Sequence, residues 1–178
     1  HLGATLKAIA GEKAAIIKNK GQGVVVAPQD PQAYQIIRNR CRAYQARACY
    51  VGEDIRYQAV SQDLKGQTFE IQSPGNGRLK LEARLLGAHQ IVNAALAVGV
   101  VESLQHLGFS ISVEAIQTGI EKTLWPGRLE VMRVHPLVIL DGAHNPASAK
   151  ALVRAILDLL PGQKVTLILG LSVDKDKR

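Results

Sequence analysis

A polar turn between an apolar run and a helical pattern is the first candidate for chemistry in this chain of 178 residues. Leu137–Leu140 predicts a buried strand, and residues 141–146 (Asp-Gly-Ala-His-Asn-Pro) follow it. Apolar residues then recur at helical spacing over residues 147–160, with Asn145 suited to the N-cap and Pro146 to the first helical position. Backbone N–H groups converge at such a helix start, so α/β proteins bind nucleotides there. A capped turn without a ligand explains the pattern equally well.

Polar side chains also stand out from apolar surroundings elsewhere. Asn93 follows His89 by four residues, so both can lie on one helix face and point into a cleft, although capping and local hydrogen bonds are the alternative. Arg128 lies in the turn at residues 125–130, where a hinge arginine can hold a phosphate with two hydrogen bonds or simply face solvent. Lys13 lies on a predicted helix, where its residue type alone favours an ordinary surface charge.

Composition excludes several classes of protein. Apolar residues make up 47% of the chain, enough for a core, yet no apolar run approaches the ~20 residues of a membrane span. The net charge of +7 favours an anionic partner. The basic residues are scattered, and with one Trp, two Phe and four Tyr the chain has few aromatic residues for stacking on bases, which argues against nucleic acid. The two cysteines, Cys41 and Cys49, form neither a disulfide framework nor a zinc motif, which favours a reducing, cytoplasmic location.

The spacing of apolar residues predicts an α/β core. Within residues 1–18 the chain enters a helix that Thr5 can cap, with apolar positions from Leu6 to Ile17. Residues 23–27, with three valines, predict a buried strand. A helix over residues 33–45 and a short strand over residues 48–51 come next. This strand–helix–strand order is typical of a parallel α/β unit.

The pattern changes after this unit. Short alternating stretches over residues 55–86 are separated by turn residues and predict a local antiparallel sheet. Two helices are predicted over residues 86–107 and 113–122. A last buried strand is predicted over residues 165–169.

Four blocks of the sequence, taken in order, resemble the folylpolyglutamate synthase / dihydrofolate synthase family within the Mur ligase superfamily. The blocks are residues 1–18, 86–95, 125–130 (Trp-Pro-Gly-Arg-Leu-Glu) and 141–146, and residues 170–176 resemble a further loop weakly. The resemblance implies an α/β protein in two parts. Residues 1–127 would form part of a central ATP-binding domain with a mixed sheet, helices and a small antiparallel sheet, and residues 128–178 would begin a Rossmann-like glutamate-ligase domain.

The resemblance also implies an activity. ATP would phosphorylate a carboxylate of a folate or dihydropteroate, and the amine of L-glutamate would attack the acyl phosphate to form an amide. ATP and Mg²⁺ are the implied cofactors. The implied protein is cytoplasmic and monomeric at full length, with neither a nucleic-acid nor a membrane partner.

The family's functional residues fall on five positions of this chain. Lys13 would carry a carbamate whose oxygens can serve Mg²⁺, which prefers oxygen ligands, and it is with His144 one of two implied catalytic residues. Asn93 would contact adenine, Arg128 would neutralise charge on the γ-phosphate and Asp141 would accept hydrogen bonds from the ribose hydroxyls. His89 and Gln90 are interpreted as structural or supporting residues.

Some features of the family are absent from the sequence. No G-x-x-x-x-G-K-[ST] phosphate loop occurs, the metal-binding glutamate is missing, and His1 matches the residue beside the metal-binding histidine rather than the ligand itself. We therefore expect an internal piece of a longer enzyme, inactive alone, whose other metal ligands precede residue 1. A Mur-type ligase with another acceptor and a non-catalytic nucleotide-binding module remain the alternatives.

Overall fold

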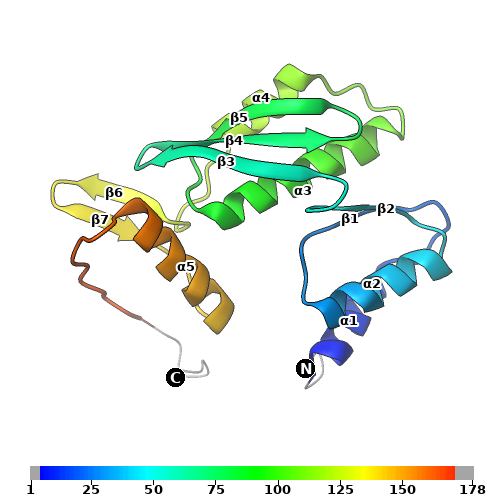
Figure 1. Ribbon diagram of the computed structural model, residues 1–178, viewed down its shortest axis with the longest axis horizontal. Coiled ribbons are helices and arrows are strands. Elements are labelled where there is room, and N and C mark those ends of the chain that lie inside the picture. Colours follow the sequence, from blue (N-terminus) through cyan, green and yellow to red (C-terminus); the bar gives the residue numbers. More distant parts are fainter. Residues whose placement is uncertain (1–4, 171–178) are drawn as a thin grey trace. The chain divides into compact units, whose positions relative to one another are not determined.

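The computed structural model describes residues 5–170 and carries five helices and seven strands over that range (Figure 1). Contacts between residues divide the chain into two units. The first unit comprises His1–Tyr57, Ile71–Leu79 and Val92–Ile116. The second comprises Gln58–Glu70, Lys80–Ile91 and Gln117–Arg178. The predicted turn at residues 141–146 lies in the second unit.

The first unit contains the predicted parallel α/β unit. Strands β1 (Gly23–Val26) and β2 (Arg47–Tyr50) pair in parallel, and helix α2 (Pro31–Ala43) connects them. Asp30 caps α2 by accepting a hydrogen bond from the N–H of Gln32 at 2.9 Å. The prediction of a strand–helix–strand unit is confirmed, although of the three valines only Val26 is fully buried.

Helix α1 (Leu6–Ala14) ends before Ile16 and Ile17, which the prediction placed among its apolar positions. Thr5 caps it as expected, since its side chain accepts a hydrogen bond from the N–H of Ala8 at 3.2 Å. The helix packs against α2. It ends early because Gln22 binds the backbone of residues 16, 18 and 19 and turns the chain there.

The predicted local sheet is present as three strands in the order β3-β4-β5. Their bounds are Arg56–Asp63, Gly66–Ser73 and Gly77–Ala83. Burial alternates along β4 and β5, so that Phe69, Ile71, Leu79 and Leu81 form the buried face. Helices α3 (Ala88–Gln105) and α4 (Val113–Lys122) follow within two residues of the predicted bounds.

The C-terminal part of the second unit positions the candidate turn. Strands β6 (Glu130–Val134) and β7 (Leu137–Leu140) form an antiparallel hairpin, and helix α5 (Pro146–Leu159) follows. Asn145 caps α5 and Pro146 is its first residue, as predicted. A small core beneath the hairpin contains Leu86, Leu129 and Ala155. Within residues 5–170 no helix is both long enough and apolar enough to cross a membrane.

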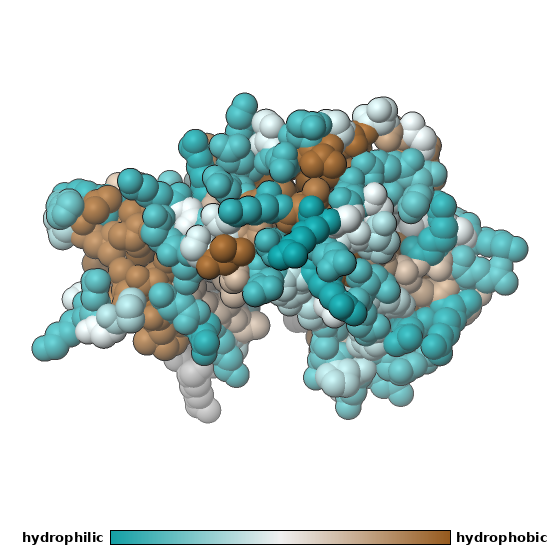
Figure 2. Space-filling model, turned by 45° about the horizontal axis from the view of Figure 1, so that its top comes forward, coloured by the Kyte–Doolittle hydropathy of each residue, from teal (hydrophilic) through white to brown (hydrophobic). Residues whose placement is uncertain are grey.

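Two predictions for this part of the chain are wrong. Strand β7 is not fully buried, because Val138 and Leu140 are 41% and 50% exposed; the hairpin is covered on one face only. Residues 165–169 form no strand, and Ile168 is 94% exposed, because this segment pairs with no described strand. Apolar side chains accordingly gather at the surface of the part that carries β6, β7 and α5 (Figure 2).

Candidate functional site

Asp141 is the first residue after β7, and its carboxylate binds the backbone on both sides of the candidate site. Oδ2 accepts a hydrogen bond from the N–H of Leu129 at 2.9 Å, and Oδ1 accepts one from the N–H of Ala143 at 2.8 Å. The side chain is half-buried. Each carboxylate oxygen has a second lone pair, so Asp141 can still accept hydrogen bonds from a ligand's hydroxyl groups.

Residues 127–130, which we call the hinge segment, have an unusual backbone. Gly127 has φ 70° and Leu129 has φ 48°, a left-handed conformation that is uncommon for a residue with a side chain. The N–H of Gly127 donates to Oε2 of Glu130 at 2.7 Å, and its carbonyl accepts from the N–H of Gly142 at 2.8 Å. Leu129 is 2% exposed, so its side chain anchors the hinge segment in the core.

The guanidinium of Arg128 lies directly against Gly142. A Cβ placed on Gly142 would be 2.6 Å from Nη1 of Arg128, closer than any real contact allows. The arginine therefore occupies the space that a side chain at position 142 would fill. Arg128 is exposed and can reach an anion, and a guanidinium can bind phosphate oxygens with two parallel hydrogen bonds.

His144 is held by the same turn. Its Nδ1 lies 2.8 Å from the carbonyl oxygen of Gly142, and because a carbonyl can only accept, this contact assigns a hydrogen to Nδ1. In the neutral ring Nε2 is then the acceptor. The adjacent start of α5 is fixed by a capping box, in which Asn145 and Ser148 exchange hydrogen bonds between side chain and backbone.

His89, interpreted from the sequence as structural or supporting, belongs to this cluster of charges. It is half-buried on the first turn of α3, and its ring packs on Gly87, where a Cβ would be 2.9 Å from Cε1. Burial lowers the pKa of His89; the nearby Asp141 carboxylate opposes this shift and Arg128 reinforces it. The neutral ring is therefore the favoured form near pH 7.

Gln67 is a supporting residue that sequence reasoning missed. It is 5% exposed on β4, and its Nε2 donates to the carbonyl oxygens of Leu85 at 2.6 Å and Gly87 at 3.2 Å. These bonds fix the chain just before His89. The signal in the sequence was a glutamine two residues before Phe69, on the buried side of an alternating strand.

The five predicted site residues are divided between the two units. Arg128, Asp141 and His144 come together in the second unit, as described above. Lys13, exposed at the end of α1, and Asn93, exposed on α3 four residues after His89, lie in the first unit. The structure therefore brings together three of the five, with His89 beside them.

Residues 1–101 match the model of the Mur ligase middle domain, and residues 127–178 match that of the Mur ligase glutamate ligase domain. The chain belongs to the Mur ligase family. The mixed α/β fold predicted from the sequence is confirmed, and so is the resemblance to folylpolyglutamate synthases and dihydrofolate synthases, as the following relatives show.

Three relatives illustrate the similarity. The dihydrofolate synthase/folylpolyglutamate synthase of Bacillus subtilis (strain 168) is 33% identical over 98% of this chain and 40% of that protein. The structure of folylpolyglutamate synthase (FPGS) from Thermotoga maritima matches with a TM-score of 0.81 and 27% identity, over 98% of this chain and 41% of that one. An FPGS-AMPPCP-folate complex matches with a TM-score of 0.81 and 29% identity, over 88% of this chain and 38% of that one. The chain thus spans about 40% of the length of these relatives.

The described residues of this Mur ligase chain do not by themselves form a magnesium site. Residues 5–170 contain no group of three or more His, Cys, Asp or Glu side chains that could hold a metal ion. Lys13 as an ammonium has no lone pair to offer a cation. By contrast, the surface formed by Arg128, Gly142 and Asp141 suits a nucleotide. Arg128 supplies a cation for phosphate, Gly142 has no side chain, and the Asp141 carboxylate can accept hydrogen bonds from hydroxyl groups.

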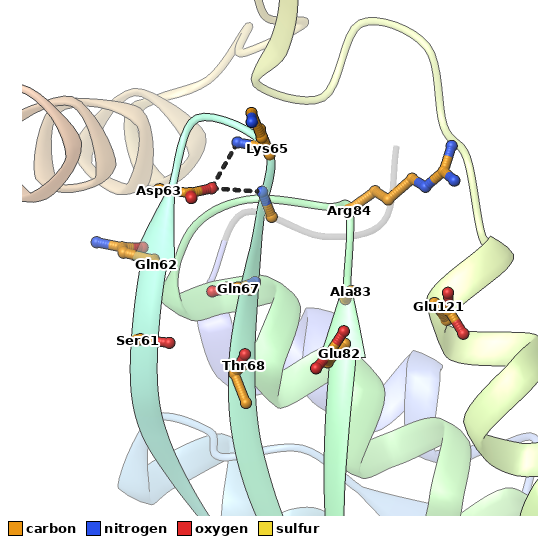
Figure 3. Close-up of a pocket in the computed structure, with 11 residues that line it drawn as sticks. Ser61, Gln62, Asp63, Lys65, Gln67, Thr68, Glu82, Ala83, Arg84 and Glu121 are labelled. Carbon is orange, nitrogen blue, oxygen red and sulfur yellow. Dashed lines mark hydrogen bonds between the residues drawn. The ribbon is translucent and has the colours of Figure 1, made fainter.

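A cavity of about 360 Å³ lies elsewhere in the second unit, at the β3–β4 turn and the end of β5 (Figure 3). Thr68, Glu82 and Arg84 line it, with Glu121 from α4. Asp63 at the turn is already bound by the backbone N–H groups of residues 65 and 66, as the dashed lines show. Acidic side chains (Glu82 and Glu121) line this cavity together with the basic Arg84, and the cavity is open to solvent. The surface around Arg128 and Asp141 is therefore the stronger candidate for an anionic ligand.

Proposed function

We propose that the protein carrying this chain is an ATP-dependent ligase that adds L-glutamate to a folate or dihydropteroate. The observation that carries the proposal is the placement of Arg128 on Gly142 beside the Asp141 carboxylate, at the start of α5. The similarity to the Bacillus subtilis enzyme and to the FPGS-AMPPCP-folate complex supports the same activity. Both relatives exceed this chain in length, so the proposal concerns the whole protein.

In this proposal each cluster residue has one task at the nucleotide. Arg128 neutralises charge that develops on the γ-phosphate, where a guanidinium matches the phosphate oxygens. Asp141 accepts hydrogen bonds from the ribose hydroxyls through its remaining lone pairs. Asn93 lies outside this cluster, in the first unit, and its proposed contact with adenine rests on the resemblance to the family alone. The half-buried, neutral His89 adds no second positive charge beside Arg128.

The reaction would run in two steps. A carboxylate oxygen of the acceptor attacks the γ-phosphorus of ATP, the bond from that phosphorus to the β,γ-bridging oxygen breaks, and ADP leaves. The glutamate nitrogen then attacks the acyl carbon, the bond from carbon to the phosphate oxygen breaks, and inorganic phosphate leaves. His144 would accept the proton that the nitrogen loses, through Nε2, because its Nδ1–H is bound to Gly142.

Three further properties belong to the proposal. We place the boundary between the ATP-binding and glutamate-ligase domains at residues 127 and 128, which is supported by the match of residues 127–178 to the Mur ligase glutamate ligase domain. Mg²⁺ is proposed as a cofactor, with Lys13 contributing oxygen atoms only as a carbamate; detection of a CO₂ adduct on Lys13 by mass spectrometry would test this modification. The protein is proposed to act in the cytoplasm as a monomer.

A substrate screen tests the proposed function. The protein at the length of its relatives is incubated with ATP and L-glutamate, and with dihydropteroate, tetrahydrofolate or a muramyl peptide as acceptor. We expect ADP formation and a glutamylated product with a pteridine acceptor. Turnover with the muramyl peptide alone would transfer the assignment to a Mur-type ligase of another branch. Nucleotide binding without any turnover would identify a non-catalytic module.

A further inference from the structure

We propose that Glu130 is a positioning residue that holds the hinge segment in the one backbone conformation that places Arg128 on Gly142. The inference rests on the proposed function, in which Arg128 acts on the γ-phosphate. It assigns a role in the reaction to a side chain that lies at the start of β6.

Glu130 is well placed to fix the hinge segment. It is the first residue of β6 and pairs with Leu140, the residue before Asp141, so its own backbone is held by the hairpin. From there Oε2 reaches back to the N–H of Gly127 at 2.7 Å, a short hydrogen bond to a charged acceptor. The bond closes the four-residue hinge segment around Arg128.

The hinge segment needs such a bond because its backbone is strained. Gly127 and Leu129 both have positive φ, and Leu129 has a β-carbon that disfavours this conformation. The conformation persists only if its surroundings determine it. Two carboxylates do so, Glu130 on the N–H of Gly127 and Asp141 on the N–H of Leu129.

These two bonds lie on either side of Arg128 and therefore fix the position of its Cα. The carbonyl of Gly127 is held as well, by the N–H of Gly142 at 2.8 Å. Gly142 is also the residue on which the guanidinium lies. Loss of the Glu130 bond would free one end of the hinge segment, let Gly127 leave its left-handed conformation and move Arg128 away from Gly142.

The experiment compares Glu130→Ala and Glu130→Gln in the protein at the length of its relatives. Alanine removes the acceptor, whereas glutamine keeps an oxygen that the N–H of Gly127 can reach. Glu121→Ala, an exposed glutamate in the same unit, is the control. Two quantities are measured: hydrogen exchange at the Gly127 amide, and kcat and KM for ATP and the pteridine substrate.

We expect Glu130→Ala to speed exchange at Gly127 by about tenfold or more, the factor that corresponds to the loss of one hydrogen bond. It should lower kcat by about tenfold while KM for the pteridine stays within twofold. Glu130→Gln should restore most of the slow exchange at Gly127 and most of kcat. Glu121→Ala should change neither the exchange rate nor kcat. Unchanged exchange and kcat in Glu130→Ala would overturn the proposal, as would a loss of kcat in Glu130→Gln equal to that in Glu130→Ala.

A double mutant shows whether Glu130 acts through Arg128. In an Arg128→Ala background, Glu130→Ala should cost no further activity; a full additional loss would overturn the proposal. If the protein shows no ligase activity, the proposed function fails, and exchange at Gly127 still decides whether Glu130 holds the hinge segment. If Glu130→Ala does not fold, Glu130→Leu, which fills similar space without an acceptor oxygen for the N–H of Gly127, takes its place in the same comparisons.

Discussion

The carboxylate of Asp141 accepts a hydrogen bond from the backbone N–H of Leu129, over 2.9 Å between Oδ2 and N. Leu129 is buried beneath the β6–β7 hairpin, whereas Asp141 begins the turn before α5. The side chain proposed to bind ribose therefore also fixes the hinge segment that carries Arg128. Substitution of Asp141 should affect both stability and nucleotide binding, and the two effects can be measured separately.

Asp141→Asn should destabilise the fold. The amide retains one acceptor oxygen for two backbone donors, and its NH₂ group faces an N–H, so one hydrogen bond is lost. We expect a fall of about 1–3 kcal/mol in the free energy of unfolding, measured by urea denaturation. The control is Asp158→Asn, which breaks only the exposed pair with Arg154 and should cost less than about 1 kcal/mol. Equal losses in the two variants would contradict this account.

Gly142→Ala should reduce activity without unfolding the protein. The new Cβ would lie 2.6 Å from Nη1 of Arg128, and the flexible end of the arginine must move away. Gly142 does not need the left-handed conformation, so the stability change should stay within about 0.5 kcal/mol. We expect kcat to fall about tenfold in steady-state assays. Wild-type kcat in this variant would show that the position of Arg128 on Gly142 is unimportant.

Gly87→Ala should destabilise the fold by about 1–3 kcal/mol, because Gly87 has φ 95° and a Cβ there would meet the ring of His89 at 2.9 Å. Thermal or urea unfolding measures the loss. Gly119→Ala is the matched control within α4, where nothing lies within 4 Å of the new Cβ. That change should stabilise by about 0.5–1 kcal/mol. A neutral Gly87→Ala would contradict the packing of His89.

His89 should make stability depend on pH. Its pKa is lowered in the folded state, chiefly by burial, so the unfolded chain binds more protons in the acid range. The contribution of neutral His89 is complete above the unfolded pKa of about 6.5 and is lost as the pH falls below that value. Urea unfolding from pH 5 to 8 should show this loss in the wild type and a smaller one in His89→Gln. If the free energy of unfolding changed with pH equally in the wild type and in His89→Gln, this prediction would be contradicted.

Local patterns predicted most of the elements but not the contacts that build the site. The bounds of α4 and the cap of α5 follow from apolar spacing and from Asn145-Pro146, which act within a few residues. Residues 165–169 have a strand-like composition yet form no strand, because a strand requires a partner. The resemblance to a family assigned roles to Arg128 and Asp141, and roles of that kind cannot be derived from spacing.

Other features of the site depend on backbone geometry or on distant residues. Leu129 adopts a left-handed conformation that no propensity suggests, and its bond to Asp141 spans 12 positions in sequence. Gln67 supports the segment before His89 from the neighbouring strand. Such contacts arise when the chain folds back on itself, so a single sequence offers little signal for them.

The central claim, ligation through an acyl phosphate, is tested most directly by following one oxygen atom. The acceptor carboxylate is labelled with ¹⁸O, and the protein at the length of its relatives is incubated with this acceptor, ATP and L-glutamate. The account predicts that the released inorganic phosphate carries ¹⁸O and that glutamylated product and ADP form together. Product formation with unlabelled phosphate, or labelled acceptor left unchanged in the presence of ATP and glutamate, would contradict it.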